Sequence, residues 1–151
     1  MELNRFTIKL QEAVFKAKNI AKKHKNQQIE TEHLIFAFLT DPDNITNFIF
    51  QKTGANPNQI KNEIEKEIKR YPQVNGNASE VYLSTSISKL INNAMSIMED
   101  MKDQYLSAEH IILAISKDKR NSVAGIFLRN GLTYDRIFRA ISEFRGNLSI
   151  D

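Results

Sequence analysis

The stretch Thr31-Glu32-His33-Leu34-Ile35-Phe36-Ala37-Phe38-Leu39 occurs twice in this chain and decides its fold. Its second copy is Ala108-Glu109-His110-Ile111-Ile112-Leu113-Ala114-Ile115, and the two histidines lie 77 residues apart. In each copy an acidic residue and a histidine precede an apolar run that is too short to cross a bilayer. Each copy therefore predicts a buried core helix.

The same offset aligns most of the chain with itself, and no gap is needed. The paired positions share apolar character or glycine, and they include Leu10 with Ile87, Ala17 with Ala94, Ile20 with Ile97, Ile49 with Ile126, Phe50 with Phe127, Gly54 with Gly131 and Ile60 with Ile137. Self-similarity at one fixed offset is typical of a duplicated structural unit. The apolar spacing within each unit is helical. We therefore predict an all-α fold of eight helices in two tandem four-helix repeats, with no strand.

Helix starts are predicted from side chains that can accept a hydrogen bond from the first turn. The residues expected at these starts are Asn4, Thr31, Asn44, Asn56, Ser84, Ser107, Ser122 and Thr133. Between the units, the stretch from Tyr71 to Ser79 breaks the helical pattern. We expect a domain at 1–146, with repeat one at about 4–70, a linker at 71–82 and repeat two at about 83–146. Residues 147–151 look like the start of a further linker.

Composition excludes several classes of protein. The chain has 21 basic and 18 acidic residues, well mixed, which suits a soluble surface and makes a weak case for nucleic-acid binding. It has no cysteine, which excludes disulfides and thiolate chemistry and favours a reducing compartment. No apolar leader or membrane-length run is visible. We expect a cytoplasmic protein that does not contact the membrane.

Motifs of catalysis are missing from the sequence. There is no glycine-rich phosphate loop, and no serine lies on a sharp strand-to-helix turn. The chain is therefore expected not to be an enzyme and to hold no cofactor.

One metal-ligand spacing does occur. Glu30-Thr31-Glu32-His33 has a Glu-x-x-His spacing that can ligate a di-metal centre in a helix bundle, but Ser107 replaces the equivalent glutamate in the second unit. We favour no metal, with His33 and His110 as partly buried histidines that hydrogen-bond to neighbouring groups. The Lys22-Lys23-His24-Lys25 cluster is attributed to the end of a helix.

With these features the chain resembles the N-terminal domain of the Clp/Hsp100 chaperone ATPases over Met1 to Gly146. The resemblance rests on Arg5-Phe6-Thr7, on the paired Glu-His-hydrophobic helices and on the closing Ile141 to Gly146. The linker Pro72-Gln73-Val74-Asn75-Gly76 is similar to that of the ClpB disaggregase branch.

The resemblance implies two four-helix units related by a pseudo-twofold axis. It also implies a linker to two ATPase modules of an AAA+ chaperone, which bind ATP and magnesium and form a hexameric ring. This chain would be a non-catalytic, substrate-engaging domain, monomeric when isolated. Its implied partners are unfolded or aggregated polypeptides, the rest of the same chaperone and possible co-chaperones, without nucleic acid.

The resemblance also implies site residues. Polar residues that engage substrate in ClpB-like proteins match Thr7, Asp103 and Glu109, and we expect Ile91 and Tyr105 to line a shallow apolar groove nearby. The alternative is that Thr7 and Glu109 are only first-turn capping residues.

Two other functions stay open. The same fold serves as an adaptor-docking domain in ClpA- and ClpC-type unfoldases that feed a protease. Downstream sequence distinguishes the branches, since a coiled-coil middle domain indicates a disaggregase and a protease-docking loop indicates the other type. An independent nucleic-acid or metal module would instead show steeply salt-dependent DNA binding or bound zinc or iron.

Overall fold

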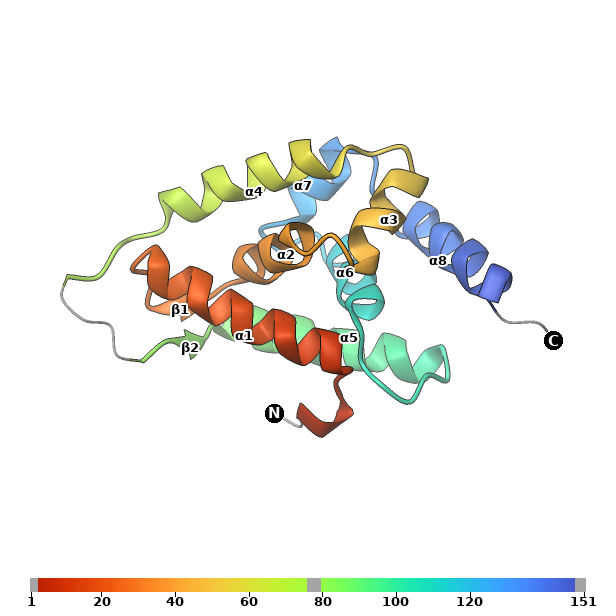
Figure 1. Ribbon diagram of the computed structural model, residues 1–151, viewed down its shortest axis with the longest axis horizontal. Coiled ribbons are helices and arrows are strands. Elements are labelled where there is room, and N and C mark those ends of the chain that lie inside the picture. Colours follow the sequence, from red (N-terminus) through yellow and green to blue (C-terminus); the bar gives the residue numbers. More distant parts are fainter. Residues whose placement is uncertain (1–2, 76–79, 149–151) are drawn as a thin grey trace.

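The computed structural model describes residues 3–75 and 80–148, and this part of the chain folds as two sets of four α-helices (Figure 1). The first set is α1 (Ile8–Lys23), α2 (Thr31–Thr40), α3 (Ile45–Lys52) and α4 (Pro57–Arg70). The second set is α5 (Thr85–Asp100), α6 (Ala108–Lys117), α7 (Ala124–Arg129) and α8 (Tyr134–Leu148). The predicted all-α architecture of two tandem four-helix repeats is confirmed.

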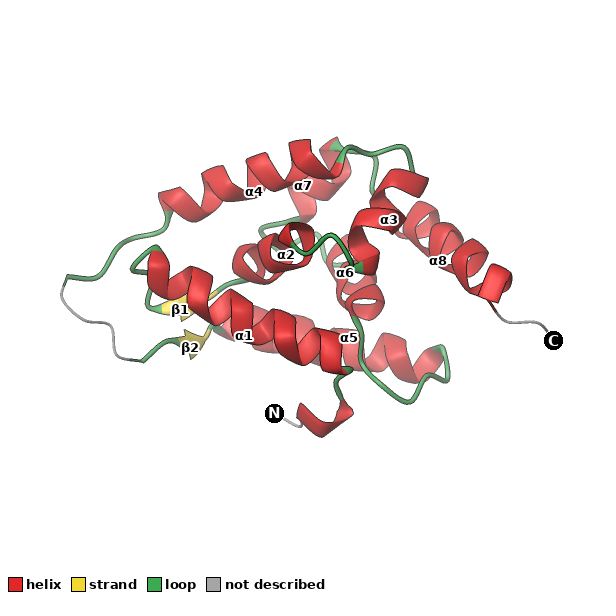
Figure 2. Cartoon of the chain, viewed as in Figure 1, coloured by secondary structure: helices red, strands yellow, loops and turns green. Residues whose placement is uncertain are grey.

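Two very short strands were not predicted. They are β1 (Gln28–Ile29) and β2 (Tyr82–Leu83), which pair in parallel (Figure 2). A 3-10 turn, Leu3–Arg5, precedes α1. The expectation of no strand is therefore wrong for these four residues, whose pairing partners lie too far away in the chain to leave a local pattern.

The short strands belong to a reciprocal pairing between the repeats. In one pair, the Ser84 amide donates to the Ile29 carbonyl at 3.1 Å; in the other, the Thr7 amide donates to the Leu106 carbonyl at 2.9 Å. At the 77-residue offset Ser84 is equivalent to Thr7, and Ile29 to Leu106. The entry segment of each repeat thus pairs with the segment that precedes the central helix of the other, as a pseudo-twofold axis requires.

The central helices α2 and α6 lie in the middle of the molecule, with α1 and α5 on one side and α4 and α7 on the other (Figure 1). Most side chains of both helices are buried. The equivalent rings of Phe50 and Phe127 meet edge to face at 5.5 Å, which places them across the pseudo-twofold axis. The two repeats therefore share one hydrophobic core.

Most predicted helix starts are confirmed. Asn44, Asn56 and Ser84 accept hydrogen bonds from amides of the first turn, Thr133 accepts one from Arg136, and Ser107 caps α6. Gly54 follows α3 in the left-handed conformation at φ +92°, as its predicted capping role requires.

Three helix starts differ from the prediction. Asn4 lies in the 3-10 turn, and Thr7 caps α1, because the pairing of Phe6 with Leu106 and the extended backbone of Thr7 separate that turn from the helix. Glu30, not Thr31, caps α2, since it directly follows β1 and keeps its extended backbone. Ser122 lies in a turn before α7, which begins at Ala124.

The described part of the predicted linker lies against the first repeat. Val74 donates its amide to the Lys25 carbonyl at 2.9 Å, which holds residues 71–75 on the first repeat. Helix α8 continues to Leu148, so 147–148 are helical, whereas residues 76–79 and 149–151 lie outside the described part. Within that part no helix combines the length and apolarity needed to span a membrane.

Candidate functional site

The two central helices begin with the same histidine cap. His33 Nδ1 accepts a hydrogen bond from the Glu30 amide at 2.8 Å, and His110 Nδ1 accepts one from the Ser107 amide at 3.0 Å. A backbone amide can only donate, so Nδ1 is unprotonated in both rings and Nε2 carries the hydrogen. The predicted hydrogen-bonding role of both histidines is confirmed, and both are fully buried.

The Nε2 partners differ between the repeats. His33 Nε2 donates to the neutral Asn26 amide oxygen at 2.9 Å, whereas His110 Nε2 donates to the Asp103 carboxylate at 2.7 Å. Burial, and after it the electrostatic effect of the neighbouring His24, lower the pKa of His33 to about 4. In the second repeat burial opposes ionisation of Asp103, yet hydrogen bonds from Arg145 and His110 hold its pKa below the usual value. The second site therefore holds an ionised carboxylate.

Arg145 of α8 joins the two predicted acidic residues. Its guanidinium donates to Asp103 at 3.1 and 2.9 Å and to Glu109 at 3.2 and 3.1 Å. The side chains of Asp103, Glu109 and Arg145 are 24, 12 and 34% exposed. Burial opposes the charge on Arg145, but the two carboxylates raise its pKa. The structure thus brings Asp103 and Glu109 together through a residue that the sequence did not single out.

Thr7 and Tyr105 lie beside this cluster. The Thr7 amide bonds to the carbonyl of Leu106, the residue after Tyr105, while the Thr7 hydroxyl accepts from the Leu10 amide. The Tyr105 side chain is 55% exposed. We call the group Thr7, Asp103, Glu109, His110 and Arg145 the charged junction. Thr7 does cap α1, and the residue is half-buried.

Ile91 offers little exposed surface to the predicted groove. Its side chain is 6% exposed, because helical spacing places it on the buried face of α5 with Ile87, Leu90 and Ala94.

An apolar hollow does exist, but along α1. It has a volume of about 420 Å³ and is lined by Leu3, Gln11, Val14, Phe15, Lys18, Ile29 and Leu83. Leu3 is 48% and Phe15 is 65% exposed, so the hollow presents apolar surface to solvent. The Leu3–Thr7 segment reaches both this hollow and the charged junction. The sequence held a signal, since Phe15 is a large apolar residue that lies off the buried face of α1.

The equivalent junction of the first repeat has uncharged side chains at two of the matching positions. Ile68, which is buried, replaces Arg145, and Asn26 replaces Asp103. Glu32, the counterpart of Glu109, instead accepts a hydrogen bond from the Tyr71 hydroxyl at 2.9 Å. Burial and Glu32 together raise the pKa of Tyr71.

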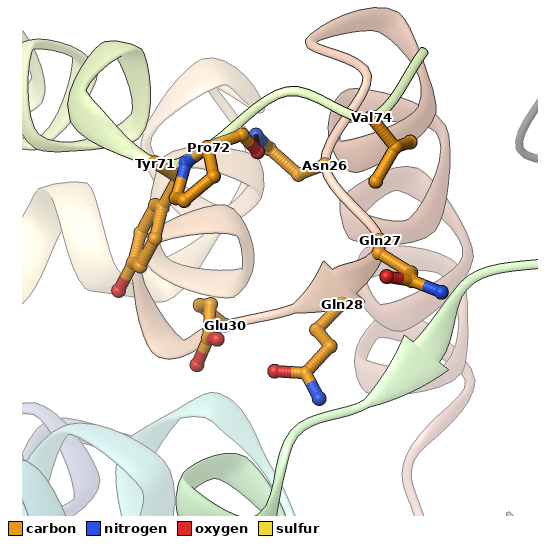
Figure 3. Close-up of a pocket in the computed structure, with 7 residues that line it drawn as sticks. All are labelled: Asn26, Gln27, Gln28, Glu30, Tyr71, Pro72 and Val74. Atoms are coloured by element: carbon orange, nitrogen blue, oxygen red, sulfur yellow. Dashed lines mark hydrogen bonds between the residues drawn. The ribbon is translucent and has the colours of Figure 1, made fainter. Parts of the chain in front are cut away.

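A small hollow of about 190 Å³ lies beside this junction of the first repeat (Figure 3). It is lined by Asn26, Gln27, Gln28, Glu30, Tyr71, Pro72 and Val74. The Asn26 amide donates to the Pro72 carbonyl across it at 3.3 Å. In the described ranges no group of three or more histidine, aspartate or glutamate side chains is arranged to hold a metal ion.

The duplicated fold matches a known domain family. Residues 5–130 match the model of the Clp repeat (R) N-terminal domain. The chain belongs to this Clp N-terminal domain family. The resemblance inferred from the duplicated helix is therefore confirmed.

Related sequences are bacterial ClpB chaperones. The chain is 37% identical over 147 residues to chaperone protein ClpB 2 of Nostoc sp., covering 97% of this chain. It is 37% identical over 145 residues to chaperone protein ClpB of Bacteroides thetaiotaomicron, covering 96% of this chain. The chain spans only 17 and 16% of the length of these two relatives.

Solved structures share the fold at lower sequence identity. The Hsp104 N-terminal domain of Candida albicans has a TM-score of 0.80 at 24% identity and covers 93% of this Clp N-terminal domain and 91% of its own chain. A ClpV N-domain in complex with a VipB peptide has a TM-score of 0.79 at 16% identity, covering 93 and 86%.

Proposed function

We propose that this Clp N-terminal domain is the non-catalytic, substrate-engaging domain of a ClpB-type ATP-dependent disaggregase in the cytoplasm. It binds unfolded or aggregated polypeptide, while ATP and magnesium bind in ATPase modules of the same chaperone, which form a hexameric ring. The proposal draws support from the ClpB relatives at 37% identity. The observation that carries it is the exposed apolar hollow next to the charged junction.

The two parts of this surface suit different groups of an unfolded chain. Phe15 and Leu3 offer apolar area to side chains that a folded protein would bury. Thr7, Asp103 and Glu109 offer oxygen atoms to backbone amides and basic side chains. On an open surface of this kind, recognition depends on apolar character rather than on one sequence, as a general binder of unfolded chains requires.

A second candidate is an adaptor-docking domain of the ClpA or ClpC type. It is favoured by the ClpV N-domain, which has the same fold and is seen with a defined peptide. An adaptor-docking domain would bind one folded or defined partner and would bind unrelated unfolded chains weakly.

The test is an NMR titration of the isotope-labelled domain with reduced, carboxymethylated lactalbumin as an unfolded probe. We expect shifts at Thr7, Tyr105 and Glu109 and along the apolar hollow. Shifts confined to α4 and α7, or no binding, would contradict the proposal. Binding by one defined adaptor but by no unfolded probe would favour the second candidate.

A matched pair of variants tests the apolar hollow directly. Phe15→Ser removes an exposed ring from the hollow, and Leu128→Ser removes a 71% exposed side chain from α7, away from it. Both changes should leave the free energy of unfolding within about 0.5 kcal/mol, because both sites are exposed. Only Phe15→Ser should weaken binding of the unfolded probe, by about tenfold. Equal binding by the two variants would place the apolar contact elsewhere.

A further inference from the structure

Arg145 already occupies the carboxylates that the proposed function assigns to polypeptide. Every oxygen of Asp103 and Glu109 accepts a hydrogen bond from its guanidinium. One Asp103 oxygen also accepts from His110, and one Glu109 oxygen also accepts from the Ser107 hydroxyl at 3.3 Å. Any basic group that approaches these carboxylates therefore meets a bound guanidinium.

The fold itself does not require this ion cluster. The first repeat builds the same histidine-capped helix start with Asn26 and Tyr71, and it buries Ile68 where Arg145 stands. Ion clusters that are partly withdrawn from water often add little net stability compared with apolar packing. The charged version of the junction therefore needs a reason other than folding.

Arg145 also anchors the end of α8. Before Arg145 in the helix, Ile141 is buried, and the Phe144 ring packs on Phe48 with the two ring centroids 5.2 Å apart. After it comes Gly146, whose Cα faces open space. Glycine is a weak helix former, and terminal turns without side-chain anchors open readily. Release of Arg145 would leave the last turn without the anchor that the cluster supplies.

We propose that Arg145 is an internal competitor for the polypeptide. Building on the proposed function, a basic side chain beside an apolar run of the bound chain displaces Arg145 from Asp103 and Glu109, and the last turn of α8 opens. Arginine is the favoured partner, because its planar fork reproduces the paired hydrogen bonds that Arg145 makes. The coupling is reciprocal: a clamped α8 weakens binding of basic segments, and their binding loosens α8.

The test uses two synthetic peptides with the same apolar run, flanked either by arginines or by neutral citrullines, and measures binding by fluorescence anisotropy. Arg145→Met removes the competitor and keeps an apolar stem. It should bind the arginine peptide about tenfold more tightly than wild type and the citrulline peptide within about twofold. Arg139→Met removes the same charge from an exposed position on α8 and should change both affinities by less than about twofold.

Hydrogen exchange of the last turn of α8 gives a second readout. Exchange should rise when wild type binds the arginine peptide but not when it binds the citrulline peptide. It should be fast in Arg145→Met without any peptide. Should Arg145→Met fail to fold, Arg145→Lys keeps one charge without the fork and should bind the arginine peptide more tightly than wild type.

The outcomes separate this inference from the function beneath it. If wild type binds but Arg145→Met gains no affinity for the arginine peptide, or Arg139→Met gains as much, the inference is overturned and the proposed function stands. If wild type binds neither peptide nor unfolded lactalbumin, the proposed function is overturned and the inference falls with it.

Discussion

At the scale of single residues, the buried hydroxyl of Thr46 lowers the stability of the folded state. Its side chain is fully buried, and its hydroxyl finds no hydrogen-bond partner within the described residues. The equivalent residue of the second repeat is Val123, also fully buried. Thr46→Val should raise the free energy of unfolding by about 1–2 kcal/mol, measured by urea denaturation, because a desolvated hydroxyl is removed. The reverse change, Val123→Thr, should lower the free energy of unfolding by a similar amount. If Thr46→Val leaves the free energy of unfolding unchanged, the Thr46 hydroxyl has a hydrogen-bond partner after all.

His33 makes stability depend on pH. The pKa of His33 is about 4 in the folded state and 6.5 in the unfolded state, so between these values the unfolded chain binds more protons. The free energy of unfolding should therefore fall by about 3 kcal/mol as the pH drops from about 7 to about 4. Urea denaturation at several pH values measures this slope. His33→Asn keeps an acceptor for the cap and should be less stable, with a flatter slope; an unchanged slope would assign the effect to other groups.

At the scale of elements, the caps of α1 and α5 form a natural pair. Thr7 and Ser84 occupy equivalent positions and make the same hydrogen bond to the first turn, at 3.1 Å in both helices. Ser84 is buried, whereas Thr7 is half-buried beside the charged junction. Each change to alanine should cost about 1 kcal/mol in the free energy of unfolding. Only Thr7→Ala should also weaken binding of the unfolded probe. If the two alanine variants bind the probe equally well, Thr7 acts only as a helix cap.

The helices were predictable because their signals are local. Apolar spacing and capping residues such as Asn56 and Ser84 lie within a few residues of the turns that they define. The two-residue strands depend on pairing partners far along the chain, so no local sequence pattern predicts them. Tertiary pairing also moved the start of α1 from Asn4 to Thr7, although the sequence alone favours either residue as a cap.

The candidate site was predictable only in part. Asp103 and Glu109 were identified by family resemblance, and the structure does bring them together. Arg145 lies 36 residues from Glu109 in the chain. The internal repeat aligns it with the apolar residue Ile68, so comparison of the two repeats gave no indication that Arg145 binds the carboxylates. The burial of Ile91 could not be predicted, because an apolar residue on a helix gives no sign in the sequence of which neighbour will cover it.

At the scale of the whole molecule, the repeats should fold only together. Each entry segment pairs with the other repeat, and Phe50 packs on Phe127 across the pseudo-twofold axis. Fragments 1–75 and 80–151 should each lack a cooperative thermal transition, because each leaves a core face exposed. An equimolar mixture should recover the helical circular dichroism signal. Cooperative melting of either fragment alone would show that one repeat is self-sufficient.

The reciprocal pairing of entry segments has an evolutionary consequence. Two identical subunits related by a true twofold axis would make this contact twice, as in an isologous homodimer. An ancestral protein with a single repeat would thus have paired its entry segment with a second copy of itself. Gene fusion would then have joined the two copies in one chain. Fusion also allowed the halves to diverge, so that one copy now has Ile68 in the core where the other has an arginine.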